Sequence, residues 1–127
     1  MNSFSQDKIE QSIQNREKLH KRFLDNSETY RNFFKLEKSA FIEGQISVKH
    51  KELMALSISI VTKCEPCIEW HTEQALLAGA ADAEFFETID IAIEMGGGPA
   101  GAYSRFALNC LDYFKEKRTS KLPDLKK

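Results

Sequence analysis

Apolar residues recur at helical spacing along most of the chain, and no stretch of any length alternates apolar and polar residues as a strand would. No proline occurs before residue 66, and the glycines are concentrated at a few points. Together these features predict an all-α fold whose helices break at glycine or proline. A chain of 127 residues can bury a modest core, so we expect a single domain over residues 1–127, ending in a flexible, charge-rich tail over residues 118–127.

Six helices follow from this spacing. The first three predicted helices are Gln6 to Phe23, Ser27 to a cap at Gly44, and Val48 to about Thr62 after a cap at Ser47. The last three are Pro66 to Gly79, a helix capped by Asp82 and ended by Gly96, and Pro99 to about Lys117. The expected core-facing residues are Ile9, Ile13, Leu19 and Phe23 in the first helix, Tyr30, Phe33, Phe34 and Phe41 in the second, and Leu53, Met54, Leu56 and Ile60 in the third.

Composition and charge exclude several classes of function. The net charge of −1 argues against a nucleic-acid-binding surface. No signal-peptide core is visible, and no apolar run approaches the ~18 residues of a membrane span, so we expect a soluble, cytoplasmic protein without a membrane partner. The GGGPAG segment lacks the strand and the Lys-Ser/Thr of a phosphate loop. No nucleotide or flavin motif is present, so we expect no cofactor, and reducing equivalents must come from outside.

The sequence CEPC places Cys64 and Cys67 three positions apart at the start of the predicted fourth helix. With three cysteines in a chain without a secretion signal, redox or metal chemistry fits better than a disulfide framework. The helix dipole and the free N–H groups at a helix start favour a thiolate over a thiol. One turn of helix also brings two such side chains close, so the pair can cycle between dithiol and disulfide.

His71 follows Cys67 by four residues, close enough on one helix face to exchange a proton with the sulfur directly or through water. Glu52 precedes a bend expected near Lys63 by eleven residues, and His71 follows the bend by eight. A rise of ~1.5 Å per residue gives heights of ~16 and ~12 Å above the bend, so a helical hairpin would set the two groups side by side. A carboxylate there would orient the imidazole and hold its proton.

Less specific interpretations stay open for each residue. Glu52 alone fits a solvated helix position, His71 alone fits a surface or core histidine, and a single C-x-x-C is a moderate signal. Glu52, Cys64, Cys67 and His71 could also supply four zinc ligands, but structural zinc prefers more sulfur or nitrogen, and we expect no metal. Cys110 lies on an apolar helical stripe and fits a buried small hydrophobe.

The whole pattern of glutamate, eleven residues, Cys-x-x-Cys, three residues and histidine resembles the alkylhydroperoxidase D-like (AhpD-like) branch of the carboxymuconolactone decarboxylase family. In this chain the pattern is Glu52, Cys64, Cys67 and His71, with no change in spacing. The segment EQALLAGA and a later helix after a glycine-proline break are also similar. The resemblance covers roughly residues 38–115, and the four-residue motif is its specific part.

The resemblance implies an all-α fold and a thiol-dependent peroxidase or disulfide reductase whose protomers form trimers or hexamers. It places attack on the hydroperoxide at Cys67, with Cys64 as the resolving residue, and it assigns the proton relay to His71 and Glu52. Helix-dipole reasoning instead favours Cys64 as the thiol of lower pKa, so the order of the two cysteines stays open.

Two positions depart from the family pattern. Pro66 stands where some peroxidase members have a histidine. Glu65 places a negative charge next to the sulfur of Cys64, which should oppose thiolate formation. Both differences would weaken a peroxidase.

We therefore predict a thiol-dependent peroxidase that reduces hydroperoxides through a Cys64–Cys67 dithiol/disulfide cycle, with a Glu52–His71 proton relay. A protein disulfide reductase or redox adaptor would share this chemistry. A lactone decarboxylase, which needs no redox cysteine pair, and a non-catalytic helical or metal-binding scaffold rank lower. The expected partners are a hydroperoxide, an external dithiol or thioredoxin-like reductant, and further copies of the chain. No motif identifies the reductant or the range of peroxides.

Overall fold

The computed structural model describes residues 3–121, with side chains described from residue 6 to residue 118. The helices are α1 (Ser3–Asn26), α2 (Glu28–Ala40), α3 (Val48–Val61), α4 (Glu65–Leu77), α5 (Asp82–Gly96) and α6 (Gly98–Lys121). No strand occurs among these residues, and the predicted all-α fold of six helices is confirmed. The predicted tail lies largely on residues 122–127, outside the described residues.

Two serines begin helices as the sequence predicts. The Ser27 hydroxyl accepts a hydrogen bond from the Tyr30 N–H at 3.0 Å, and the Ser47 hydroxyl accepts one from the His50 N–H at 3.1 Å. Each bond satisfies an N–H group that the first helical turn leaves without a partner. These caps fix where α2 and α3 begin.

Other predicted boundaries are wrong by a few residues. α2 stops at Ala40 with Phe41 as its C-cap, so Gly44 lies in the following loop rather than at the helix end. Ala81, not Asp82, is the N-cap of α5, and its N–H donates to the Glu84 carboxylate at 3.0 Å. A glutamate in the third helical position can thus replace the expected aspartate cap by binding the cap backbone from inside the helix.

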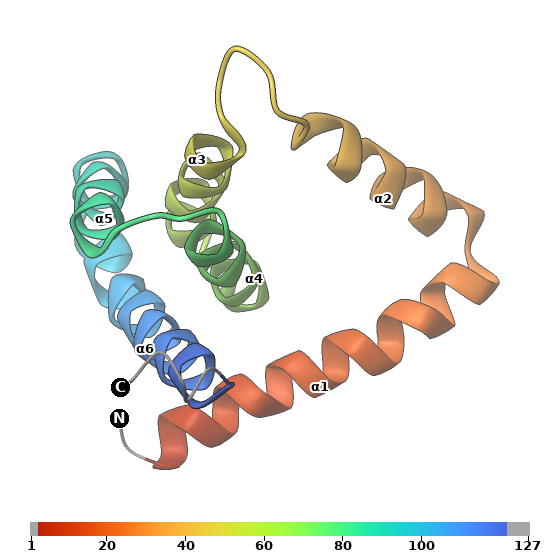
Figure 1. Cartoon of the computed structure of the whole chain (residues 1–127), viewed down its shortest axis with the longest axis horizontal. Coiled ribbons are helices and arrows are strands. Elements are labelled where there is room, and N and C mark those ends of the chain that lie inside the picture. The colour runs from red at the N-terminus through yellow and green to blue at the C-terminus, as the bar shows by residue number, and fades with distance from the viewer. Residues whose placement is uncertain (1–2, 122–127) are drawn as a thin grey trace.

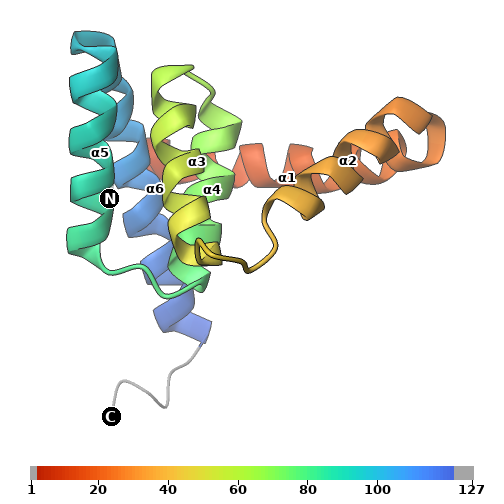
Figure 2. The ribbon, with the colours of Figure 1, turned by 90° about the horizontal axis from the view of Figure 1, so that it is seen from above.

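The body of the protein consists of α3, α4, α5 and α6, which stand side by side in Figure 2. α3 packs against α4 and α5, and α6 packs against α4 and α5 on the other side. The buried core draws mainly on Leu53, Leu56 and Ile60 of α3, Ile68 and Ala75 of α4, Phe85 and Ile89 of α5, and Ala107, Cys110, Leu111 and Phe114 of α6. Leu53, Leu56 and Ile60 of α3 are buried as predicted, whereas the prediction for Met54 is wrong, because its side chain is 45% exposed.

The α1–α2 hairpin forms an arm that extends away from this body (Figure 1). The first half of α1 lies on α6, where Ile9 is fully buried, whereas Phe23 near its other end is 52% exposed. α2 buries no residue, and its Phe33 is 64% exposed. The predicted core-facing stripe of α2 is therefore wrong within one protomer, because the arm carries that stripe away from the four-helix body.

Within the described part of the chain, no helix combines the length and the apolar character that crossing a membrane requires.

Candidate redox site

A tight reversal between α3 and α4 places the two cysteines. The Cys64 N–H donates to the Ser59 carbonyl at 3.0 Å, and the Lys63 N–H donates to the Ile60 carbonyl at 3.1 Å. This pair of bonds is the Schellman pattern that ends many helices. Lys63 takes the left-handed position of the motif with φ of 60°, where glycine is the usual residue. The turn makes Cys64 at once the last residue of this motif and the N-cap of α4.

Cys64 and Cys67 are joined by a disulfide at the start of α4, with their Cα atoms 5.2 Å apart. The Cys64 sulfur also accepts a hydrogen bond from the Cys67 N–H at 3.3 Å. Pro66 occupies the first turn, where its missing N–H costs no helical hydrogen bond. Both cysteines are half-buried and Pro66 is exposed, so the pair lies at the protein surface.

The Glu52 and His71 side chains meet across the α3–α4 hairpin, as the counting of helical rises predicts. Glu52 Oε2 lies 2.8 Å from His71 Nδ1, and the two side chains are only 7% and 14% exposed. The Phe41 ring stacks on the imidazole, with ring centroids 5.5 Å apart and planes at 20°. A carboxylate on one side and an aromatic ring on its face thus fix the orientation of His71.

The negative charge of Glu65 has a cationic partner that the sequence interpretation did not foresee. Lys8 Nζ of α1 lies 2.7 Å from Glu65 Oε2, and both side chains are partly exposed. Because the ammonium offsets the carboxylate, Glu65 opposes a thiolate at Cys64 less than its position in the sequence suggests. The ion pair also joins α1 to the first turn of α4.

A second, buried ion pair joins α1 to the same helix. Arg16 of α1 forms a salt bridge with Glu69, which is fully buried, and the Ser12 hydroxyl donates to Glu69 Oε1 at 3.3 Å. The Arg16 guanidinium also lies over the Trp70 ring, 4.7 Å from its centroid. From the sequence, Glu69 and Trp70 flank His71 and have no assigned chemistry.

A signal for these contacts exists in the sequence. Lys8, Ser12 and Arg16 follow each other at four-residue steps and so share one face of α1, and Glu65 and Glu69 do the same on α4. Two such faces of opposite charge can pair in register. The sequence alone does not say that the two helices meet.

Cys110 is apart from this chemistry. It is a free thiol on α6 and fully buried. Burial, and then the charges of Glu69 and Glu65, raise the pKa of the Cys110 thiol well above its usual value. The expectation that Cys110 is a buried hydrophobe is confirmed.

Among residues whose side chains the structure describes, no group of three or more histidine, cysteine, aspartate or glutamate side chains is arranged to hold a metal ion. The sulfurs of Cys64 and Cys67 are engaged with each other, and the carboxylate of Glu52 is engaged with His71.

The fold and this site define a class of all-helical protein in which a surface cysteine pair at a helix start lies in the same hairpin as a buried carboxylate–imidazole pair. The model of the carboxymuconolactone decarboxylase family matches residues 27–109. The chain belongs to the carboxymuconolactone decarboxylase family. The resemblance inferred from the spaced motif is confirmed, and the match is compatible with the AhpD-like branch.

Sequence relatives come from two bacteria. Uncharacterized protein 4 in the cox locus of Paracoccus denitrificans is 38% identical over 80 residues, which span 63% of this chain and 72% of that protein. An uncharacterized protein of Cupriavidus necator is 37% identical over 75 residues, which span 59% of this chain and 66% of that protein.

Solved structures share the fold over most of the chain. A carboxymuconolactone decarboxylase family protein of Thermotoga maritima, described as "possibly involved in antioxidative response", superposes with a TM-score of 0.80 at 31% identity, covering 87% of this chain and 95% of that one. A family protein of Legionella pneumophila, solved in its apo form, gives a TM-score of 0.74 at 30% identity, covering 87% and 96%.

Proposed function

We propose that the protein is a thiol-dependent peroxidase that reduces hydroperoxides through a cycle of the Cys64–Cys67 pair. The observation that carries the proposal is the disulfide at the start of α4, with the buried Glu52–His71 pair in the same hairpin. The antioxidative role suggested for the Thermotoga maritima relative points the same way.

In the proposed cycle the Cys67 thiolate attacks the terminal oxygen of a hydroperoxide, the O–O bond breaks, and an alcohol leaves after taking up a proton. The sulfenic acid formed on Cys67 then condenses with the Cys64 thiol, releasing water and forming the disulfide. An external dithiol returns two electrons and two protons to the pair.

His71 would move the proton in this cycle. When Nδ1 carries the proton shared with Glu52, Nε2 is left as the acceptor for the thiol proton. His71 lies one helical turn after Cys67 on the same face of α4. Glu52 would act through His71, by holding the ring in place and stabilising the imidazolium that forms.

A protein disulfide reductase is the second candidate, and one specific observation favours it. Cys64 is the N-cap of α4, where its sulfur accepts the Cys67 N–H. That position favours a Cys64 thiolate, and a thiolate is the group that attacks the sulfur of a substrate disulfide. Reduction of insulin disulfides by the reduced protein would measure this activity.

The peroxidase proposal is tested by the consumption of cumene hydroperoxide in the presence of excess dithiothreitol. We expect turnover by the native protein and loss of turnover in Cys67→Ser, with Cys110→Ala as the matched control that retains it. Cys110 is buried and has a raised thiol pKa, so it should not take part. Equal turnover by native protein and Cys67→Ser would reject the proposal.

A further inference from the structure

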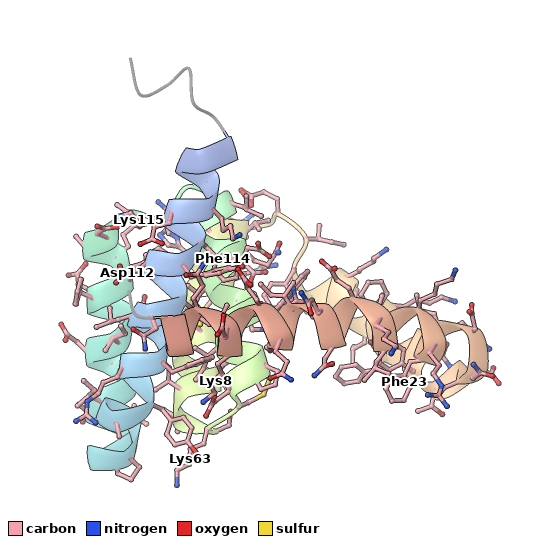
Figure 3. All side chains as sticks on the ribbon, turned by 90° about the horizontal axis from the view of Figure 1, so that it is seen from below. Lys8, Phe23, Lys63, Asp112, Phe114 and Lys115 are labelled. Carbon is pink, nitrogen blue, oxygen red and sulfur yellow. A yellow bond between two sulfur atoms is a disulfide. The ribbon has the colours of Figure 1, made fainter. Side chains whose placement is uncertain are left out.

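Phe41 lies where the arm returns to the four-helix body, in direct contact with the candidate site. It is the C-cap residue of α2, and its N–H donates to the Glu37 carbonyl at 3.2 Å. Phe23, labelled in Figure 3, lies out along the same arm and away from the body. Phe41 instead stacks on the imidazole of His71, the residue to which the proposed cycle assigns the proton.

The linker between α2 and α3 ties the Phe41 ring to the start of α3. Lys51 Nζ donates to the Ile42 carbonyl at 2.6 Å, and Glu43 Oε2 accepts the Val48 N–H at 2.6 Å. Both bonds join the linker to the first turn of α3, the helix that also carries the carboxylate partner of the imidazole. The aromatic ring and the carboxylate that contact the imidazole therefore belong to one connected segment.

The contact between Phe41 and His71 has the geometry of an offset stack. The ring centroids are 5.5 Å apart, and the planes are inclined by 20°. A cation within about 6 Å of an aromatic centroid is attracted by the negative face of the ring. In the proposed cycle, His71 becomes such a cation when Nε2 takes up the thiol proton of Cys67. The attraction is therefore stronger after the proton has moved than before.

The Phe41 ring also excludes water, which acts in the opposite direction by disfavouring charge on the imidazole. The N–H groups of an imidazolium are its hydrogen-bond donors, and they lie in the plane of the ring. Glu52 takes the Nδ1 side, whereas Phe41 covers a face. A group on the face displaces little of the hydration of the N–H groups, so the attraction to the aromatic ring outweighs the lost hydration.

We propose that Phe41 is a positioning residue of the proton relay, whose aromatic face stabilises the imidazolium form of His71. The inference rests on the proposed cycle and adds a second group, beside Glu52, that favours the charged imidazole. In the step concerned, the proton of the Cys67 thiol moves to Nε2 and the sulfur keeps the electron pair as a thiolate. Loss of the aromatic face should therefore lower the amount of thiolate.

The first test uses reduced protein and no peroxide. The rate at which iodoacetamide modifies Cys67 at pH 7 is followed by peptide mass spectrometry. Phe41→Leu keeps an apolar side chain but lacks the aromatic face, and we expect it to lower the rate about five-fold. Phe41→Tyr keeps the aromatic face and should stay within about two-fold of native protein. Phe33→Leu, at an exposed position of α2, is the matched control and should leave the rate unchanged.

Fluorinated phenylalanines at position 41 separate electrostatics from packing. Fluorine withdraws electrons from the aromatic ring and weakens its negative face while adding little volume. We expect the rate of Cys67 modification to fall from phenylalanine to monofluorophenylalanine and again to trifluorophenylalanine, the last coming close to Phe41→Leu. A role in packing alone would leave the three rates equal.

Nitrogen NMR of reduced protein with labelled histidine reports the charge of the His71 ring directly. At pH 6, the ratio of imidazolium to imidazole at His71 should fall about five-fold in Phe41→Leu relative to native protein. This measurement involves neither a peroxide nor modification of a cysteine. Native protein without peroxidase turnover, but with this five-fold fall, would reject the proposed peroxidase and still support the role of Phe41.

Three results would overturn the inference. Equal rates across the fluorinated series would assign Phe41 to packing alone. An unchanged imidazolium ratio in Phe41→Leu would show that the stack does not act on the charge of His71. A higher ratio in Phe41→Leu would show that the exclusion of water outweighs the attraction of the aromatic face.

Discussion

At the scale of single residues, the three cysteines differ in their surroundings. Cys64 and Cys67 are half-buried at a helix start, whereas Cys110 is fully buried with a raised thiol pKa. We predict that iodoacetamide at pH 8 modifies two thiols in the reduced, folded protein and a third only after denaturation, because Cys110 stays protonated below its raised pKa. Peptide mass spectrometry locates the labels. Rapid modification of Cys110 in folded protein would contradict its placement.

The Glu52 carboxylate is the second residue with a specific expected effect. Glu52→Gln keeps the shape of the side chain but removes the charge that stabilises an imidazolium at His71. We predict a fall in peroxidase turnover of roughly 10- to 100-fold, smaller than the roughly 10²–10⁴-fold of a direct general base. The rate between pH 5 and 9 is measured with Glu87→Gln, on the exposed surface of α5, as the control. Unchanged turnover in Glu52→Gln would exclude the relay.

At the scale of helices, α1 depends on polar contacts as well as on Ile9. Arg16→Met leaves the buried Glu69 carboxylate without its cation. We predict that the free energy of unfolding falls by roughly 2–3 kcal/mol. This loss is smaller than the cost of breaking a fully buried ion pair, because Arg16 is partly exposed. Urea unfolding measures it. Arg16→Met with Glu69→Leu should recover most of the loss. A single variant as stable as native protein would show that the pair does not anchor α1.

The hairpin of α3 and α4 was predictable because its evidence is local. The position of Glu52 beside His71 follows from the serine caps, the expected bend near Lys63 and a constant rise per residue. In the structure, Glu52 Oε2 lies 2.8 Å from His71 Nδ1. Lys63 at φ of 60° was not predictable, since a lysine gives no signal for the left-handed position that glycine usually takes.

The arm was not predictable from the same kind of evidence. The apolar spacing of Tyr30 and Phe34 marks one face of α2 but does not say what covers it. The contact of Arg16 with Glu69 joins residues 53 positions apart, and periodicity within one helix carries no information about such a contact. Pairing of distant helices depends on the packing of the whole body.

At the scale of the whole molecule, the surface is large for the mass. The accessible area is 8499 Å², while a compact monomer of this mass exposes about 6,900 Å². The extended arm accounts for part of the difference. Apolar residues also gather on the outer face of the body, where Met54 and Ile91 line one shallow hollow and Ile58 is 64% exposed. A protomer of this shape is expected to bury surface against other copies.

The exposed apolar surface favours assembly, and the resemblance to the AhpD-like branch implies three or six protomers, so we predict an assembly of that size from protomers of 14.5 kDa. Light scattering coupled to size-exclusion chromatography measures the mass. Ile58→Glu should lower the mass, because a charge would be placed on an apolar face. A native protein that runs as a monomer at all concentrations would contradict the prediction, and so would an Ile58→Glu variant that keeps the native mass.

In the proposed cycle, Cys64 and Cys67 form a disulfide as a hydroperoxide is reduced and separate again when a dithiol reduces them. Its most direct test is mass spectrometry of fully reduced protein, before and after one equivalent of cumene hydroperoxide. We expect the loss of two hydrogens within residues 64–67, with Cys110 unchanged, and return of the original mass after addition of a dithiol. Both thiols remaining free while the peroxide persists would contradict it.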